Sequence, residues 1–240
     1  MRAVPRWAVV VTALCGAAFV ALAALVTAGW SPLLDLDRAV GTRVHAVAVA
    51  HPGLVRAADV GAVVLHPDVF RVAVVAFAGW LVWRGRPWPA FWAVLTMTVG
   101  SLAGIGLKLL IARDRPSFPD PVAHAAGYSF PSGHALDAAL AVLVVGAVVW
   151  PSLRRRTLPL ALGTLLVLLA GLDRIVLGVH YVTDVVGAWL AAAAIVGLTA
   201  RLLRLGSGRA GSARPRRTMR VRGSGVTGSH ARFRSWCLRA

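Results

Sequence analysis

Three short polar stretches decide how this chain is organised: KLLIARDRP at residues 108–116, PSGH at residues 131–134 and DRIVLGVHYVTD at residues 173–184. Each of them lies at the end of a long apolar run. Charged side chains are costly in hydrocarbon unless they face protein or water, so their concentration in these places indicates a site. We therefore expect the rest of the chain to hold the three stretches together at one face of a membrane.

The remainder of the sequence is strongly apolar. Of the 240 residues, 58% are hydrophobic, against roughly 45–50% in soluble globular domains. Several apolar runs exceed about 18 residues, which is long enough for an α-helix to cross a hydrocarbon core of about 30 Å. The predicted fold class is all-α, a polytopic membrane helix bundle with six transmembrane helices.

The first apolar run, residues 7–30, is bracketed by tryptophans, which favour the membrane interface. A secretory signal has an apolar region of only about 7–15 residues, so we interpret this longer run as a retained span. Five more spans are expected at residues 68–83, 88–112, 134–150, 158–176 and 181–204.

The chain divides into three predicted regions. Residues 1–67 hold the first transmembrane helix and then short extracytoplasmic surface helices, because apolar residues recur there at helical spacing between polar ones. In an alternative, residues 54–65 dip into the bilayer, although they are too few to cross it. Residues 68–204 form a core of five transmembrane helices. Residues 205–240 contain nine arginines and no acid, which predicts a disordered cytoplasmic tail, either attracted to anionic lipid headgroups or simply solvated.

The charge balance indicates an orientation in the membrane. The formal net charge is +17, from 26 basic and 9 acidic residues, but the arginines flank apolar spans, which argues against a nucleic-acid partner. With the N-terminus inside, 18 basic residues fall on the cytoplasmic side, in agreement with the positive-inside bias. The three polar stretches then face the extracytoplasmic side of the cell membrane, and both termini are cytoplasmic. The eight basic residues on that outer side are Arg38, Arg43, Arg56, Arg71, Lys108, Arg113, Arg115 and Arg174.

In the first polar stretch, Lys108 and Arg115 are seven residues apart, or about two helical turns, so we expect them on one helix face. Pro116 ends the helix because it lacks a backbone donor. Two cations on one face suit a polyanionic ligand. The alternative is a lysine that extends its amine to the membrane surface.

The second stretch predicts a helix start, with Ser132 as the N-cap residue. Free backbone N–H groups at a helix N-terminus bind phosphate oxygens, and Gly133 lets the backbone approach a ligand closely. By itself this tetrapeptide is weak evidence, because an ordinary capped helix with a surface histidine at His134 fits it as well.

The third stretch places His180 and Asp184 four residues apart, on one face of the next helix. Asp184 can accept a hydrogen bond from imidazole Nδ1–H and leave Nε2 as a nucleophile, the arrangement of the serine-protease triad. Arg174 precedes His180 across a turn. Taken singly, Asp184 could instead stabilise the helix dipole, and His180 could be an interfacial histidine.

In their order and spacing, the three stretches resemble the signature of the type-2 phosphatidic acid phosphatase superfamily. This superfamily includes lipid phosphate phosphatases, undecaprenyl pyrophosphate phosphatases and vanadium haloperoxidases. The resemblance covers about residues 68–204, and six spans fit its membrane branch. One departure is Asp173, which stands where the family commonly has serine before Arg174; the extra carboxylate could weaken the hold of Arg174 on phosphate or orient it.

The resemblance implies a phosphatase core that hydrolyses a lipid phosphate or polyprenyl pyrophosphate through a phosphohistidine. His180 is the expected nucleophile, His134 the acid and base, and Asp184 the residue that orients His180. The expected phosphate-binding residues are Lys108, Arg115, Ser132, Gly133 and Arg174. With these cations and no carboxylate cluster for Mg²⁺, we expect no metal and no cofactor.

Other functions fit the same residues less well. A phosphotransferase would pass the phosphoryl group to a lipid or sugar acceptor in place of water. A lipid or anion transporter would carry its charges near the midplane, whereas here they lie at span ends. A non-catalytic scaffold is expected to lack one of the two histidines. Phosphatidate, phosphatidylglycerophosphate and polyprenyl pyrophosphate all remain open as substrates.

Three further charged residues have no role in that scheme. Arg113 and Asp114 are interpreted as a local surface pair. Asp137, one turn after His134, could pair with Arg113 or Lys108, or could orient His134.

Overall fold

The structure, a computed structural model, describes residues 5–210, and this part of the chain is entirely helical apart from its connections. The helices are α1 Arg6–Thr27, α2 Ser31–Ala50, α3 Pro52–Val64, α4 Pro67–Trp83, α5 Pro87–Ile111, α6 Gly133–Val149, the short 3₁₀ helix η1 Trp150–Ser152, α7 Thr157–Val176 and α8 Val182–Ala210. The all-α prediction is confirmed.

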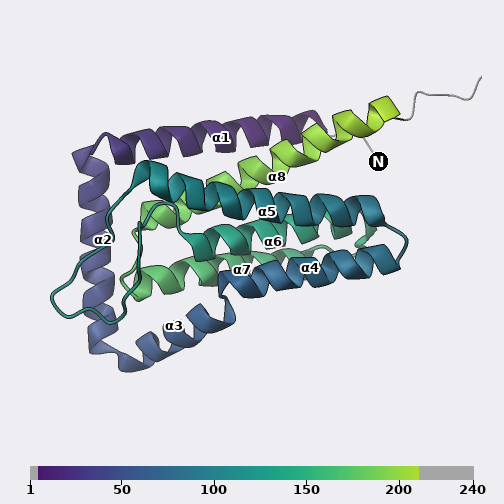
Figure 1. Ribbon diagram of the computed structural model, residues 1–240. Helices are drawn as coiled ribbons and strands as arrows, with labels where there is room; N and C mark the ends of the chain where they lie inside the picture. Colours follow the sequence, from purple (N-terminus) through teal and green to yellow (C-terminus); the bar gives the residue numbers. More distant parts are fainter. Residues whose placement is uncertain (1–4, 211–240) are drawn as a thin grey trace, which may run out of the picture.

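Within residues 5–210, six stretches are long and apolar enough to cross a membrane, as expected from the sequence. They are Arg6–Thr27, Pro52–Trp83, Pro87–Ile111, Gly133–Ser152, Thr157–Val176 and Val182–Leu203. The second one joins α3 to α4 through a break at His66, and α4 is the part that runs alongside the other spans (Figure 1). Helix α8 continues to Ala210, beyond residue 205, where the tail was predicted to begin; residues 211–240 lie outside the described residues.

Prolines define several helix starts. Pro52, Pro67 and Pro87 each occupy the first turn of a helix, where the missing N–H costs nothing and the fixed φ suits the helix. At its other end α5 stops at Ile111, because Ala112 adopts a left-handed conformation with φ 48°. The polar loop between α5 and α6 therefore begins three residues before Arg115.

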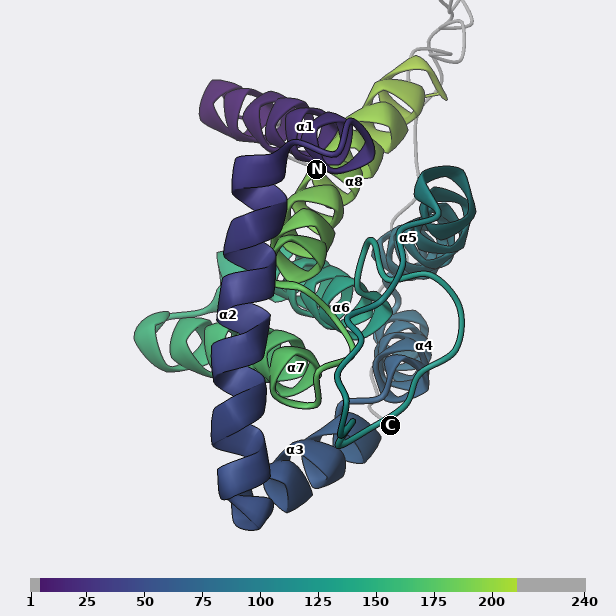
Figure 2. The same ribbon diagram turned by 90° about the vertical axis from the view of Figure 1, so that its left-hand side faces the viewer.

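The helices form a bundle with one helix laid across its end. In Figure 1, α1 and α4–α8 extend across the picture with roughly parallel or antiparallel axes, while α2 runs perpendicular to them at the left-hand end. Figure 2 looks onto this end, with α2 in front and the α5–α6 loop beside it. Helices α2 and α3 lie between residues 31 and 67, where short helices were expected, and their place at the membrane surface stays a prediction. Helix α2 packs against α1, α3, α7 and α8.

Helix α6 is the centre of the bundle. Half of the residues in its most apolar segment are buried, against 6% of those in the corresponding segment of α1. Helix α6 packs against α4, α5, α7 and α8. Gly100 and Gly104 of α5 face Leu140 and Leu136 of α6 so closely that neither glycine has room for a Cβ atom. Such a pair of glycines four residues apart lets two membrane helices approach each other. The close packing fixes the N-terminus of α6 in place.

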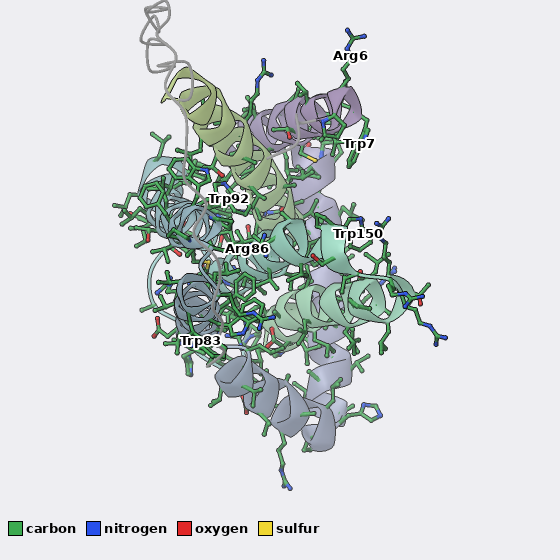
Figure 3. The ribbon with its side chains drawn as sticks, turned by 90° about the vertical axis from the view of Figure 1, so that its right-hand side faces the viewer. Arg6, Trp7, Trp83, Arg86, Trp92 and Trp150 are labelled. Carbon is green, nitrogen blue, oxygen red and sulfur yellow. The ribbon has the colours of Figure 1, made fainter. Side chains whose placement is uncertain are left out.

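The two ends of the bundle differ in charge. All nine acidic residues lie towards the α2 end of the bundle. They belong to α2, α3, the first turns of α4 and α8, the second turn of α6, the α5–α6 loop and the last turn of α7. Figure 3 shows the opposite end, where Arg6 and Arg86 lie with Trp7, Trp83 and Trp150. Arginines and tryptophans together at helix ends are typical of a membrane interface.

Candidate active site

The three polar stretches meet at the α2 end of the bundle. The first touches the third, because Arg115 Nη1 lies 3.1 Å from His180 Nε2. The second touches the third, because the backbone N–H of Ser132 donates to the carbonyl oxygen of Asp184 at 3.0 Å. Contacts that span 65 and 52 residues of sequence thus form one cluster, between α6, α8 and the two connections beside them.

His180 lies in the turn between α7 and α8 and is held at both ring nitrogens. Asp184 Oδ2 is 3.3 Å from Nδ1 and also accepts from the backbone N–H of Tyr181 at 2.9 Å. Arg115 can donate to Nε2, which leaves Asp184 to accept from Nδ1–H. The pairing expected from the four-residue spacing is present, although α8 begins only at Val182 and the turn, rather than a helix face, positions the imidazole.

Burial decides the charge of His180. The side chain is 4% exposed, and this burial lowers the pKa of His180 to about 4, although the hydrogen bond to Asp184 raises it in part. Because the ordinary value is 6.5, the imidazole is neutral at neutral pH and has a lone pair at one nitrogen. A neutral imidazole with Nδ1–H held by a carboxylate is suited to nucleophilic attack through Nε2.

His134 lies in the first turn of α6, in the surroundings of several other polar groups. Its ring meets the ring of His66 edge to face, with 5.4 Å between the centroids. Arg174 and His180 are close enough to act on it electrostatically, and the backbone of Ala62 lies against it. The expected neighbourhood of two histidines and an arginine is therefore present. His66, at the break between α3 and α4, is an addition that the sequence analysis missed.

The expectation that Lys108 and Arg115 share a helix face is wrong, because α5 ends between them. Both side chains instead tie down the α5–α6 loop. Lys108 Nζ donates to the carbonyl of Tyr128 at 2.7 Å, and Arg115 donates to those of Gly127 and Ala126 at 2.8 and 2.9 Å. A further bond from Arg115 Nη1 to the carbonyl of Val179 joins the loop to the His180 turn.

Two buried donors in the cluster have no partner among the described residues. They are Nη2 of Arg174, whose side chain is 9% exposed, and Oγ of Ser132, which is completely buried. Ser132 occupies the N-cap position of α6, but its hydroxyl does not cap the helix, contrary to the expectation. An unpartnered buried donor costs about 1–3 kcal/mol, so such groups mark a place where a ligand supplies the acceptor.

Asp173 takes part in this arrangement. Its Oδ1 accepts from Nε of Arg174 at 3.0 Å, which turns the other edge of the guanidinium away from Asp173. Of the two effects considered for this departure from the family pattern, the geometry is the one expected for orienting Arg174. Gly133 begins α6 and has open space where a side chain would lie, so the backbone there is accessible to a ligand.

Arg113 is not a surface residue paired with Asp114, because it is turned inward after the helix ends at Ile111. Its side chain is 10% exposed and contacts two carboxylates: Nη1 is 2.7 Å from Asp184 Oδ1, and Nη2 is 2.8 Å from Asp37 Oδ2. Asp37 comes from α2 and was not a candidate residue. Its contact with Arg113 spans 76 residues of sequence, so no local pattern could have indicated it.

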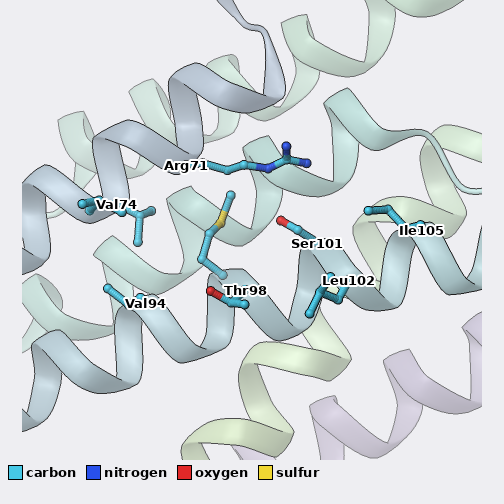
Figure 4. Close-up of a pocket in the computed structure, with 9 residues that line it drawn as sticks. Arg71, Val74, Val94, Thr98, Ser101, Leu102 and Ile105 are labelled. Atoms are coloured by element: carbon cyan, nitrogen blue, oxygen red, sulfur yellow. The ribbon is translucent and has the colours of Figure 1, made fainter.

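Asp137 pairs with neither Arg113 nor Lys108. Arg71 Nη2 lies 2.7 Å from Asp137 Oδ2, and the hydroxyl of Ser101 donates to Oδ1 at 3.0 Å. This cluster connects α4, α5 and α6 one turn below His134. Arg71 and Ser101 also line a mostly apolar cavity of about 270 Å³ between α4 and α5 (Figure 4). Its other lining residues are Val74, Val75, Val94, Met97, Thr98, Leu102 and Ile105.

About half of the chain matches a known protein family. Residues 89–205 match the PAP2 superfamily. Over 119 residues the chain is 34% identical to phosphatidylglycerophosphatase B of Bacillus subtilis (strain 168), a match that covers 48% of this chain and 57% of that protein. The chain thus matches less than two thirds of the length of this relative.

A solved structure shares the fold. It is the crystal structure of the first transmembrane PAP2 type phosphatidylglycerolphosphate phosphatase from Bacillus subtilis, with a TM-score of 0.62 and 23% sequence identity. The likeness covers 85% of this chain and 98% of that one, so it extends beyond the segment that matches the family.

Proposed function

We propose that this chain, whose residues 89–205 match the PAP2 superfamily, belongs to that superfamily and is an integral membrane phosphatase that hydrolyses a lipid phosphate. The reaction takes place at the extracytoplasmic face and passes through a phosphohistidine. The relative named phosphatidylglycerophosphatase B makes phosphatidylglycerophosphate the first substrate to test. Phosphatidate and polyprenyl pyrophosphate, which present phosphate at the same depth in the membrane, are the next substrates to test.

The observation that carries the proposal is the pair of unpartnered donors beside two histidines. Arg174 Nη2 and Ser132 Oγ are buried next to the N-terminus of α6, where free backbone N–H groups and the helix dipole favour an anion. A tetrahedral oxyanion satisfies both donors at once.

The chemistry follows from the positions of the two imidazoles. Nε2 of His180 attacks phosphorus, and the bond from phosphorus to the lipid oxygen breaks as the nitrogen–phosphorus bond forms. Arg115 Nη1, which now faces Nε2, shifts its hydrogen bond to a non-bridging oxygen of the phosphoryl group. Asp184 stabilises the positive charge that develops on the imidazole through Nδ1–H.

His134 moves the protons. In the first step it donates a proton to the departing lipid alkoxide, which leaves as an alcohol. In the second step it accepts a proton from water, whose oxygen attacks the phosphohistidine, and His180 is released with its lone pair. Inorganic phosphate is the second product. Arg174 and the amides at the start of α6 hold the remaining oxygens throughout both steps.

The charge difference between the two ends of the bundle supports the proposed orientation. The end opposite the site carries Arg6, Arg84 and Arg86 and the cluster at residues 154–156, and no acidic residue. The positive-inside bias assigns this end to the cytoplasm. The site then opens at the outer leaflet, where a lipid headgroup presents its phosphate at the level of α2.

The proposal is tested with purified full-length chain in detergent, supplied with phosphatidylglycerophosphate, phosphatidate and polyprenyl pyrophosphate. We expect release of free phosphate from at least one lipid, and no release by His180→Gln. His51→Gln is the matched control, because His51 is exposed and bonds only to the carbonyl of Val47. EDTA should leave the rate unchanged, since arginines and helix amides take the role of a metal. Equal rates for His180→Gln and the parent would refute the proposal, and label transferred to an organic acceptor would identify a phosphotransferase.

A further inference from the structure

We propose that Asp37 of α2 is a positioning residue for the reaction, acting through Arg113 and Asp184 on His180. The inference rests on the proposed function for its kinetic consequences but on geometry for its evidence. It makes α2, the helix that lies across the end of the bundle, part of the catalytic apparatus (Figure 2).

Asp37 is buried and fully engaged. Its side chain is 2% exposed, Oδ1 accepts from the backbone N–H of Thr183 at 3.2 Å, and Oδ2 accepts from the hydroxyl of Thr183. Oδ2 also accepts from Nη2 of Arg113 at 2.8 Å. All of these contacts go to the first turn of α8 or to the start of the α5–α6 loop, the two segments that adjoin His180.

Arg113 carries the contact onward to the catalytic pair. Nη1 donates to Asp184 Oδ1 and to the hydroxyl of Thr183, each at 2.7 Å. The guanidinium lies over the ring of Tyr181, with Cζ 4.1 Å from the centroid. One planar cation is thus fixed by Asp37 on one side, by Asp184 on the other and by an aromatic face, the geometry in which arginine cannot be replaced by lysine.

The consequence for His180 follows from how Asp184 is shared. Oδ2 of Asp184 accepts hydrogen bonds from Nδ1 of His180 and from the backbone N–H of Tyr181, while Oδ1 accepts one from Nη1 of Arg113. With both oxygens occupied, the carboxylate cannot rotate, and the imidazole keeps one tautomer and one direction. Loss of Asp37 leaves Arg113 with a single carboxylate anchor, so the carboxylate of Asp184 and the ring of His180 gain freedom.

A neighbour on the same helix shows that this arrangement is specific to Asp37. Asp35 lies on nearly the opposite side of α2, is 66% exposed and pairs only with Arg38 at 2.7 Å. Burial of a carboxylate is costly unless it is paired and hydrogen-bonded, and Asp37 meets that cost with contacts to the site alone. Asp35 is therefore the matched control for every experiment on Asp37.

The kinetic test compares Asp37→Asn with Asp35→Asn in the purified full-length chain. We expect kcat of Asp37→Asn to fall by about 10- to 100-fold, the effect of a small misplacement of a reacting group. KM should stay unchanged because Asp37 does not touch the substrate. Asp35→Asn should behave as the parent, and Arg113→Lys should reproduce the loss in kcat. An unchanged kcat in Asp37→Asn refutes the inference.

A second comparison separates positioning from general destabilisation. In an Asp184→Asn background, Asp37→Asn should lower the residual kcat no further, because its influence passes through Asp184. If the two losses multiply, Asp37 acts on stability or elsewhere, and the inference is wrong.

A spectroscopic readout keeps the inference apart from the proposed function. In ¹⁵N-histidine-labelled chain, the His180 resonances should report one tautomer in the parent and in Asp35→Asn, and a mixture in Asp37→Asn. This spectrum needs no substrate. Absence of phosphate release by the parent chain would refute the proposed function, whereas an unchanged His180 spectrum in Asp37→Asn would refute the role of Asp37.

Discussion

The two histidines of the site differ in how tightly they are held. His180 is bonded at both ring nitrogens, by Asp184 and Arg115, and is almost fully buried. His134 is only half-buried, and in the described part of the chain no side chain hydrogen-bonds to its ring; its nearest ring is that of His66. The difference corresponds to two tasks. A nucleophile benefits from a fixed direction of attack, whereas an acid and base must serve first the leaving group and then water.

The largest effect is expected on removal of the fixed imidazole. His180→Gln should lower kcat by at least about a thousandfold, because loss of a covalent nucleophile removes the two-step route altogether. Phosphate release from the lipid substrate measures this effect, with His51→Gln as control. Membrane insertion and helix content should be those of the parent. A variant that keeps a tenth of the parent rate would assign the nucleophile to another residue.

Removal of the less restrained imidazole should cost less and should depend on the leaving group. His134→Gln is expected to lower kcat by about 100-fold or more with a lipid alcohol as leaving group. A p-nitrophenyl ester releases p-nitrophenolate, which leaves without being protonated. With this substrate, the first step catalysed by His134→Gln should recover most of the parent rate. The comparison of burst rates for the two esters measures this. Equal losses for both leaving groups would contradict the role of His134 as the acid.

The burial of His180 should also be visible on titration. Because burial lowers the pKa of His180 to about 4 from 6.5, this ring stays neutral until the pH falls towards 4. The unfolded chain takes up the proton first, so the contribution of His180 to stability is complete above about pH 6.5 and declines between 6.5 and 4. A ¹⁵N titration, assigned by comparison with His180→Gln, should place the midpoint near 4. A midpoint near the ordinary value would show that the imidazole is solvated.

The smallest effect is expected from the residue that departs from the family pattern. Asp173→Ser should lower kcat/KM only a few-fold, about 3- to 10-fold, because Arg174 keeps its charge and loses one orienting hydrogen bond of about 1 kcal/mol. The effect should appear in kcat/KM with phosphate monoesters. An increase in kcat/KM would show that the carboxylate weakens the hold of Arg174 on phosphate.

The membrane spans and part of the site could be predicted from the sequence. Apolar length gave the six spans, and the four-residue spacing gave the pairing of His180 with Asp184, since both depend on local geometry. Lys108 and Arg115 were placed on one face because the pattern does not show that Ala112 leaves the helix. Helix periodicity gives no warning of a single left-handed residue.

The supports of the two histidines could not be predicted in the same way. Asp37 contacts Thr183, which lies 146 residues away in the sequence. The exposed Asp35 lies only two positions before Asp37, and no local pattern indicates which of the two carboxylates is buried. His66 contacts His134 from the break between α3 and α4, and no local pattern in the sequence indicates that contact. Contacts of this kind depend on how α2 and α3 fold back over the bundle, which is a tertiary property.

The central claim, attack on phosphorus by His180, is tested most directly by trapping the intermediate. The purified chain is mixed with phosphorus-32-labelled lipid phosphate, quenched in base within one turnover and digested, and the labelled peptide is sequenced. We predict an acid-labile, base-stable label on His180. When His134→Gln reacts with a labelled p-nitrophenyl ester, more label should be present on His180 at the same time point than in the parent chain, because the variant slows the second step. Label on another residue, or turnover of the parent chain without any labelled histidine, would contradict the account.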